Sequence, residues 1–276
     1  MDDVEFIILS VCLLLIPLWT LSAGFRFWVK LLLFGISIAL AASFAALISL
    51  PFGRSPRNHR KAFWILHRLN FWMALNLDLR NTERLASSDP YIVICNHQSA
   101  LDVLMVSYIW PDNCVALMKS SLRFAPAFNI YAYLCCDIFV ERFVKEEAWK
   151  CVDNALSVIN TFRCKVWIFP EGTRNCASNL LPFKKGAFVL AKKANLPIVP
   201  VVISSYKPFY DWETMKFDPH GNVVMYVLPA IDPTSFSDVD SLIDHCRQKM
   251  NDEFRRMSFP QEMRNSSEKV VHPPRN

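Results

Sequence analysis

His97 and Asp102 lie five residues apart and are of types that can do acid–base chemistry. A histidine can accept a proton near neutral pH, and a carboxylate can orient its ring and stabilise the imidazolium. On one continuous helix, residues five apart point roughly 140° away from each other. The spacing therefore predicts a catalytic pair only if His97 lies in a turn and Asp102 in the first turns of the following helix. Alternatively, His97 is an ordinary loop histidine and Asp102 only favours a helix N-terminus.

A polar turn at Glu171, Gly172, Thr173 and Arg174 could bind an anion. Gly172 is one of only six glycines, and glycine allows a positive φ or a close approach of a ligand to the backbone. Arg174 could hold a phosphate through two parallel hydrogen bonds, while Glu171 could accept from a substrate hydroxyl or hold Arg174. The alternative is a structural turn closed by a Glu–Arg pair.

Two further cations, Lys184 and Lys185, precede Gly186 at the start of a predicted helix. Helix N-termini favour anions, so this segment could add to a phosphate site. The alternative is a solvated basic turn.

The elements that must position these residues alternate between strand and helix. Runs of apolar and β-branched residues predict six strands, at residues 91–95, 114–118, 137–141, 165–169, 198–204 and 223–228. Longer patterns predict helices at residues 99–110, 121–135, 145–162, 184–195 and 239–256. This alternation predicts an α/β domain with a largely parallel or mixed sheet and flanking helices.

Each of the first four predicted strands is followed at once by polar residues. His97 follows the first strand, Lys119 the second, Arg142 the third and Glu171 the fourth. In open α/β sheets, ligands bind beyond the carboxyl ends of the strands. A lone Lys119 or Arg142 would usually be a surface residue, but the shared position favours one crevice with a base beside a phosphate site.

The composition indicates contact with a membrane. The chain has 276 residues, of which 53% are hydrophobic and only 20% charged. Its formal net charge of +5 fits anionic lipid or a phosphate ligand, and we expect no nucleic-acid partner. The nine cysteines lack the spacing of zinc sites, so we expect reduced thiols facing the cytosol and no bound metal.

The first third of the chain carries two uncharged runs, residues 6–23 and 31–50, joined by a link at 24–30. Each is long enough, as a helix, to span a hydrocarbon core. We expect a membrane hairpin that crosses twice, with a re-entrant wedge as the alternative. Small residues of the second run could pack on the first: Gly35, Ala41, Ala42, Ala45 and Ala46. The acidic start of the chain disfavours a signal peptide.

The basic flank at 54–61 predicts that everything after it is cytosolic. Residues 57–77 read as a helix lying at the membrane interface or, equally, as an ordinary core helix. We therefore expect an anchor over 1–56, a catalytic domain over 57–258 and a polar tail over 259–276.

The motifs resemble those of the glycerolipid acyltransferase family, and in particular its lysophosphatidic acid acyltransferases. The resemblance rests on Asn-His-Gln-Ser-x-x-Asp at 96–102 and Phe-Pro-Glu-Gly-Thr-Arg at 169–174. Segments 138–142, 181–188 and 199–206 resemble further blocks of the family, and the likeness extends over about 57–254. One departure is Cys136, which stands where the family usually has a glycine, six residues before Arg142.

The resemblance implies roles for individual residues. His97 would be the general base and Asp102 its orienting partner. The glycerol-phosphate acceptor would be bound by Arg142, Glu171, Gly172, Thr173 and Arg174, with Lys119 and Lys184 close by, and Pro200 would shape the pocket.

The activity that the resemblance implies is transfer of a fatty acyl group from acyl-CoA to the sn-2 hydroxyl of 1-acyl-glycerol-3-phosphate. The products would be phosphatidic acid and CoA, with acyl-CoA as co-substrate and no cofactor. Alternatives are another acceptor, such as glycerol-3-phosphate or a different lysophospholipid, and a non-catalytic lipid-phosphate binder. A covalent acyl-enzyme through Cys95 or Ser99 is disfavoured because neither lies in a Gly-x-Ser-x-Gly elbow. We expect an integral membrane protein of the endoplasmic reticulum, although no retention signal identifies the organelle.

Overall fold

The structure is a computed structural model and describes residues 4–5, 16–140 and 145–259. Its first long element is helix α2 (Ala23–Ser49), which begins where the Ser22 hydroxyl accepts a hydrogen bond from the amide of Phe25. The expected link at 24–30 is therefore wrong, because these residues continue into the same helix. Residues 6–15 of the first uncharged run lie outside the described residues, so two crossings remain a prediction.

One side of α2 packs on the rest of the protein and the other is exposed. Ala42, Ala45 and Ala46 are buried together with residues of α3 (His59–Leu69) and α5 (Pro126–Leu134). These alanines thus contact the catalytic domain, which corrects their expected packing on the first uncharged run. The exposed large apolar residues of α2 include Trp28, Leu32, Ile36, Leu40, Phe44 and Leu47. In the part of the chain that the structure describes, one helix, Ala23–Phe52, is long and apolar enough to cross a membrane.

A seven-stranded sheet forms the centre of the domain, in the order β1-β9-β6-β2-β5-β3-β4. Neighbouring strands are parallel except for β6 and β9, so the predicted largely parallel or mixed sheet is confirmed. The strands are β1 (Asn76–Arg80), β2 (Ile92–Cys95), β3 (Cys114–Lys119), β4 (Ile138–Val140), β5 (Lys165–Ile168), β6 (Ile198–Ile203) and β9 (Asn222–Val227). A two-stranded ribbon, β7 (Tyr210–Asp211) with β8 (Lys216–Phe217), lies outside this sheet.

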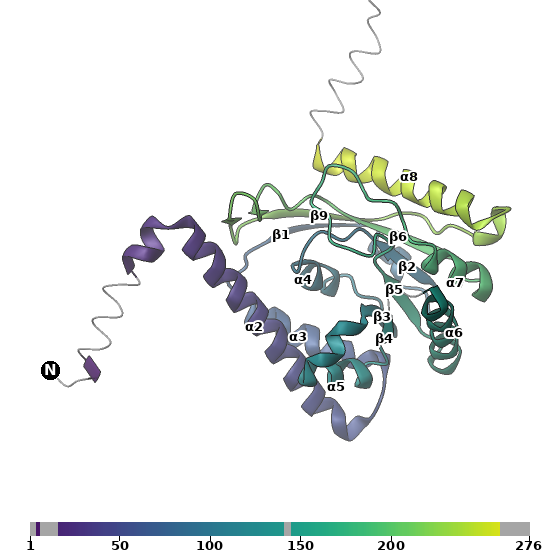
Figure 1. Ribbon diagram of the computed structural model, residues 1–276, viewed down its shortest axis with the longest axis horizontal. Helices are drawn as coiled ribbons and strands as arrows, with labels where there is room; N and C mark the ends of the chain where they lie inside the picture. Colours follow the sequence, from purple (N-terminus) through teal and green to yellow (C-terminus); the bar gives the residue numbers. More distant parts are fainter. Residues whose placement is uncertain (1–3, 6–15, 141–144, 260–276) are drawn as a thin grey trace, which may run out of the picture.

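Helices cover both faces of the sheet (Figure 1). Alternate residues of β2 point to opposite faces, as the pleat requires. Ile92 and Ile94 pack with α6 (Lys145–Phe162), α7 (Gly186–Ala194) and α8 (Val239–Ser258). Val93 and Cys95 belong to the other core, which includes residues of α2, α3 and α4 (Asp102–Ser107). Because both faces are covered, the central strands are apolar throughout and their polar groups are concentrated at the strand ends.

Two β elements differ from the predictions. The helix expected over 57–77 ends at Leu69, and its last expected residues form the start of β1. β1 is a largely exposed edge strand that pairs only with β9, so its structure depends on a distant partner. The β7–β8 ribbon was not predicted. The expected polar tail lies beyond the described residues except for its first residue, Phe259.

Candidate active site

His97 and Asp102 lie where the chain leaves β2 and enters α4. His97 follows the end of β2 by two residues, and Asp102 is the first residue of α4. Nδ1 of His97 lies 2.6 Å from Oδ2 of Asp102, and their side chains are 18% and 1% exposed. This is the arrangement that the five-residue spacing required: a turn carries the histidine, and the first turn of the helix carries the carboxylate.

Asp102 accepts hydrogen bonds at both of its carboxylate oxygens. The main-chain amides of Gln98 and Ser99 donate to Oδ2, at 2.7 and 3.0 Å. The hydroxyl of Tyr206 lies 2.7 Å from Oδ1. The carboxylate is therefore held by the turn that precedes its own helix and by the loop that follows β6, which fixes the orientation that it presents to His97.

Phe169 and Glu171 hold His97 from the neighbouring turn after β5. The Phe169 ring stacks on the imidazole with their centroids 4.2 Å apart. Oε1 of Glu171 accepts a hydrogen bond from the main-chain amide of His97 at 3.0 Å. The two sequence motifs, which are more than 65 residues apart in the chain, thus meet at adjacent strand ends (β2 and β5 are parallel neighbours).

Both oxygens of Glu171 are occupied by donors from the protein. Oε2 accepts from Nδ2 of Asn175 at 3.0 Å and from the amide of Leu181 at 2.9 Å. Burial raises the pKa of Glu171, and these hydrogen bonds oppose that increase. The arrangement favours a positioning role for Glu171, and its contact with an acceptor stays a prediction.

The remaining residues of this turn face outward. Gly172 has φ +70°, so it adopts the left-handed backbone that glycine accommodates without strain. A Cβ at this position would lie 3.3 Å from Cγ of Lys184, whose amide donates to the carbonyl of Pro170 at 2.7 Å. Thr173, Arg174 and Lys184 are exposed. The predicted phosphate ligands of this segment are thus accessible on one side of the catalytic pair.

Three other predicted ligands have different surroundings. Lys119 is exposed at the end of β3. Pro200 is buried within β6, opposite Ile94 of β2, and is not among the residues that line the two cavities beside the pair. Arg142 lies outside the described residues. Cys136, which precedes it, has φ 63°, so a cysteine here adopts the backbone for which the family usually has glycine.

Two cavities flank the catalytic pair. The first, of about 310 Å³, reaches Phe169, Gly172 and Lys184 and is otherwise lined mainly by apolar residues, among them Leu117, Met118, Val152, Ile168 and Leu190. The second, of about 270 Å³, is lined by Gln98, Cys176, Tyr206, Lys207 and Tyr210, among others. The first cavity contacts Phe169, which stacks on His97, and the second contacts Gln98 and Tyr206, which lie next to the pair; the second is also lined by Asp211 and Glu213.

Neither side chain considered as a covalent nucleophile is well placed. Cys95 is fully buried, and burial raises the pKa of its thiol well above the usual range. Ser99 is 6% exposed, and its hydroxyl oxygen accepts a hydrogen bond from the amide of Leu101. A thiol that stays protonated is a poor nucleophile, so the geometry favours His97 acting on a substrate hydroxyl.

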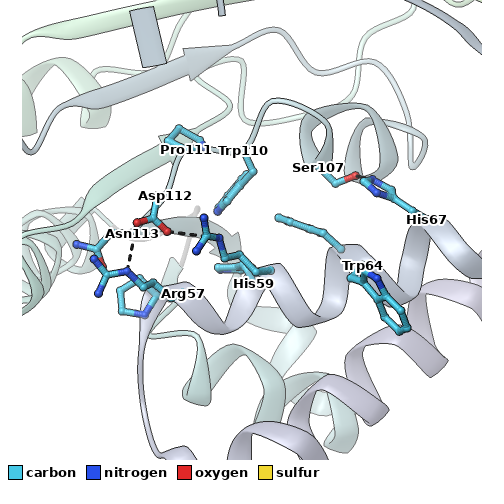
Figure 2. Close-up of a pocket in the computed structure, with 12 residues that line it drawn as sticks. Arg57, His59, Trp64, His67, Ser107, Trp110, Pro111, Asp112 and Asn113 are labelled. Atoms are coloured by element: carbon cyan, nitrogen blue, oxygen red, sulfur yellow. Dashed lines mark hydrogen bonds and ion pairs between the residues drawn. The ribbon is translucent and has the colours of Figure 1, made fainter. Parts of the chain in front are cut away.

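A third cavity, of about 290 Å³, lies away from this site, against α3 and the segment before β3 (Figure 2). Arg57 pairs there with Asp112 at 3.2 Å, and Nε2 of His67 lies 2.7 Å from the hydroxyl of Ser107. Asp112 precedes β3, so this cavity does not lie at the carboxyl ends of the strands, where ligands of such sheets bind.

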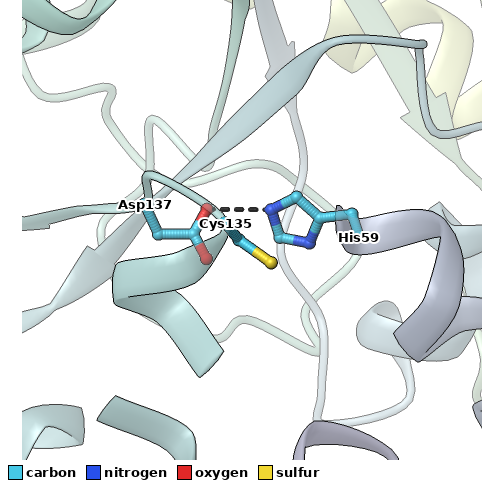
Figure 3. A group of neighbouring side chains, drawn as sticks. All are labelled: His59, Cys135 and Asp137. Carbon is cyan, nitrogen blue, oxygen red and sulfur yellow. Dashed lines mark hydrogen bonds and ion pairs between the residues drawn. The ribbon is translucent and has the colours of Figure 1, made fainter. Parts of the chain in front are cut away.

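His59, Cys135 and Asp137 form a separate cluster with groups that could hold a metal ion (Figure 3). Their ligand atoms lie within 4.8 Å of one another, and the imidazole nitrogens already contact Asp137 Oδ1 at 2.9 Å and the Tyr131 hydroxyl at 2.7 Å. These contacts join α3 to α5 and to the start of β4. This cluster could not be predicted from the sequence, because its members come from positions 59 and 135–137 without a short ligand spacing.

Comparisons with known proteins identify the family to which the chain is related. The family model described as Acyltransferase matches residues 76–204. The putative 1-acyl-sn-glycerol-3-phosphate acyltransferase acl-1 of Caenorhabditis elegans is 47% identical over 224 residues, which is 81% of this chain and 85% of that protein. The human 1-acyl-sn-glycerol-3-phosphate acyltransferase beta is 36% identical over 256 residues, 91% of each chain.

A solved structure shares the fold. The crystal structure of the 1-acyl-sn-glycerophosphate (LPA) acyltransferase PlsC from Thermotoga maritima matches with a TM-score of 0.64, covering 85% of this chain and 98% of that chain at 20% identity. The identities to the curated relatives extend over most of both chains, as the motifs at 96–102 and 169–174 led us to expect. The chain therefore belongs to the acyltransferase family and is an O-acyltransferase.

Proposed function

We propose that this protein transfers a fatty acyl group from acyl-CoA to the free sn-2 hydroxyl of 1-acyl-glycerol-3-phosphate, giving phosphatidic acid and CoA. The acceptor is supported by the names of the relatives, which are 1-acyl-sn-glycerol-3-phosphate acyltransferases at up to 47% identity. The observation that carries the chemistry is the His97–Asp102 pair. Nδ1 of the imidazole faces the carboxylate, and among the described residues Nε2 has no hydrogen-bond partner, so it is available to a substrate hydroxyl.

The proposed reaction is a direct transfer. Nε2 of His97 accepts the proton of the acceptor hydroxyl while the oxygen attacks the thioester carbonyl carbon. The carbon–sulfur bond then breaks, and the sulfur leaves with the proton that the imidazolium returns. Asp102 stabilises the imidazolium between these steps. The thioester is already activated, so this scheme assigns no step to a metal or cofactor.

Exposed cations beside the pair suit the phosphate of the acceptor. Arg174 can form two parallel hydrogen bonds with phosphate oxygens, and Lys184 lies against Gly172 in the same turn. Thr173 adds a hydroxyl donor, Lys119 lies at the same end of the sheet, and a contribution of Arg142 stays a prediction. The apolar cavity next to Phe169 suits the acyl chain of the donor, because its lining is mainly aliphatic.

The proposed substrates and helix α2 both support attachment to a membrane. The acceptor and the product carry acyl chains, and α2 exposes a row of large apolar side chains along a helix long enough to cross a bilayer. Arg54, Arg57, Arg60 and Lys61 follow its C-terminal end, so the positive-inside rule supports a catalytic domain in the cytosol. The endoplasmic reticulum is our proposed location.

The test is release of free thiol from acyl-CoA by purified protein in detergent, with a panel of acceptors. We expect release with 1-acyl-glycerol-3-phosphate and little with glycerol-3-phosphate or other lysophospholipids. His97→Ala should abolish release while acceptor binding is largely retained. Activity in His97→Ala would overturn the base assignment. A preference for another acceptor would overturn the substrate, and no release with any acceptor would favour a non-catalytic binder.

A further inference from the structure

Tyr206 is the residue that connects the catalytic pair to the loop after β6. Its side chain is 2% exposed, and its hydroxyl lies 2.7 Å from Oδ1 of Asp102. Among the described residues, this hydroxyl is the hydrogen-bond partner of Oδ1. Oδ2 instead contacts Nδ1 of His97 and accepts from two main-chain amides. We infer that Tyr206 is a positioning residue that orients Asp102 and moderates its stabilisation of the His97 imidazolium. This inference rests on the proposed function.

The direction of the Tyr206–Asp102 hydrogen bond is set by chemistry. Burial raises the pKa of the Tyr206 phenol well above its usual range, and the Asp102 carboxylate adds to the increase. The phenol therefore stays protonated and donates to the carboxylate. A donor at Oδ1 withdraws negative charge from the carboxylate, so less remains at Oδ2 to stabilise a positive imidazole ring.

The loop that carries Tyr206 is itself tied to the first motif. The Asn96 side chain both donates to and accepts from the main chain of Ile203, at 3.0 and 2.8 Å. The Gln98 side chain donates to the carbonyl of Ser204 at 2.9 Å and accepts from the amide of Tyr206 at 3.2 Å. Three residues of this motif, Asn96, Gln98 and Asp102, therefore bond to residues 203–206. These hydrogen bonds hold the loop after β6 in place and keep the Tyr206 hydroxyl next to the Asp102 carboxylate.

Other titratable groups surround the pair, and their charges also affect its pH dependence. Asp102 interacts electrostatically with Tyr210, Cys95 and Cys176 in addition to Tyr206, and Glu171 interacts with His97. Tyr206 is distinguished from all of these because it is the side chain that donates directly to Oδ1. Removing its hydroxyl leaves the rest of this surrounding set unchanged.

The test compares Tyr206→Phe with Tyr91→Phe. Tyr91 is a matched control because it is also 2% exposed and its hydroxyl makes one 2.7 Å hydrogen bond, to the carbonyl of Leu85, away from the pair. For Tyr206→Phe we expect about a tenfold lower kcat with a KM changed less than about twofold. Because a freed carboxylate stabilises the imidazolium more, the acid limb of the kcat/KM profile should move to higher pH, by about half a unit or more. Tyr91→Phe should keep the wild-type limb.

A purely structural role would lower activity equally at all pH values, and an unmoved limb in Tyr206→Phe overturns the inference. A second readout needs no substrate: the titration midpoint of the His97 ring signal by NMR, assigned through its loss in His97→Ala. The midpoint should rise in Tyr206→Phe and stay constant in Tyr91→Phe. If the wild-type protein releases no thiol with any acceptor, the proposed function fails while this titration still decides the role of Tyr206.

Discussion

The main-chain amide of His97 donates a hydrogen bond to Oε1 of Glu171 at 3.0 Å, across 74 positions of the chain. The bond connects the turn after β2 to the turn after β5, and these strands are parallel neighbours. The carboxylate therefore supports the histidine through its backbone. The second motif thus contributes to the geometry of the base as well as to the predicted phosphate site.

Glu171→Gln should lower both stability and kcat. Glutamine keeps the size but replaces one acceptor oxygen with an NH2 group, which would face the amide of His97 or the donors Asn175 and Leu181. A buried donor left facing another donor costs about 1–3 kcal/mol, measurable as a lower Tm. The control is Glu253→Gln on α8, which loses a partly exposed pair with Arg256 and should cost less. Wild-type Tm and kcat in Glu171→Gln would contradict this role.

Gly172→Ala should raise the KM for the acceptor several-fold and lower the free energy of unfolding by about 1–2 kcal/mol. An L-residue at φ +70° is strained, and the new Cβ would lie 3.3 Å from Lys184. Gly35→Ala in α2 is the matched control, because it lies away from this turn and a Cβ there would meet nothing within 4 Å beyond its chain neighbours and its own helix backbone. Thiol release against acceptor concentration and thermal unfolding provide the measurements. Equal effects of the two substitutions would show that the turn does not need its glycine.

We expect His67 to make the stability of the folded protein depend on pH. Burial lowers the pKa of His67, so the unfolded chain binds a proton more readily than the folded protein does. The stabilising effect of neutral His67 is complete above its ordinary pKa of about 6.5 and is lost as pH falls through that value toward the lower pKa of the folded state. His67→Gln should reduce the drop in Tm between about pH 7 and pH 5, whereas His220→Gln, at an exposed position, should not. A drop that persists unchanged in His67→Gln would contradict the assignment.

Removal of metal ions should leave thiol release unchanged. The proposed reaction needs only the imidazole and an activated thioester, and the cluster of His59, Cys135 and Asp137 is a hydrogen-bonded joint between α3 and β4. The measurement is activity and Tm after exhaustive dialysis against a chelator. A loss that zinc restores would contradict the prediction. Cys135→Ser, compared with its buried neighbour Cys136→Ser, would then show whether the metal binds at this cluster.

The sequence predicted β2, β5 and β6 well because these strands are buried along their whole length and are almost entirely apolar. β2 to β6 were all found within one or two residues at each end, and α6 was found at both ends. β1 was missed because its side chains are mostly exposed and its conformation depends on pairing with β9. The continuity of α2 was missed because Arg26 and Lys30 suggested a break, although charged residues do not interrupt a helix whose backbone is otherwise regular.

The candidate site could be predicted where residues lie so close in the sequence that their spacing restricts how their side chains can meet. The spacing of His97 and Asp102 allowed one arrangement for a catalytic pair, and the structure has it. The contact of Tyr206 with Asp102 could not be predicted, because nothing in the local sequence fixes which strand lies next to β2. The same limit applies to Glu171, for which the sequence left a substrate hydroxyl and Arg174 as possible partners, and whose observed partners include the amide of Leu181.

The reversal of strand direction between β6 and β9 divides the loops of this protein into two groups. The loops that follow β2, β3, β5 and β6 leave the sheet at the strand ends where the catalytic pair lies. The loops after β1 and β9 leave at the opposite ends of the strands. Evolution or design can therefore lengthen or exchange the segments after Arg80 and Val227 without rebuilding the catalytic pocket. An insertion there would still have to keep the hydrogen bonds of Leu228 and Ile231 to β6 and the buried side chain of Leu85.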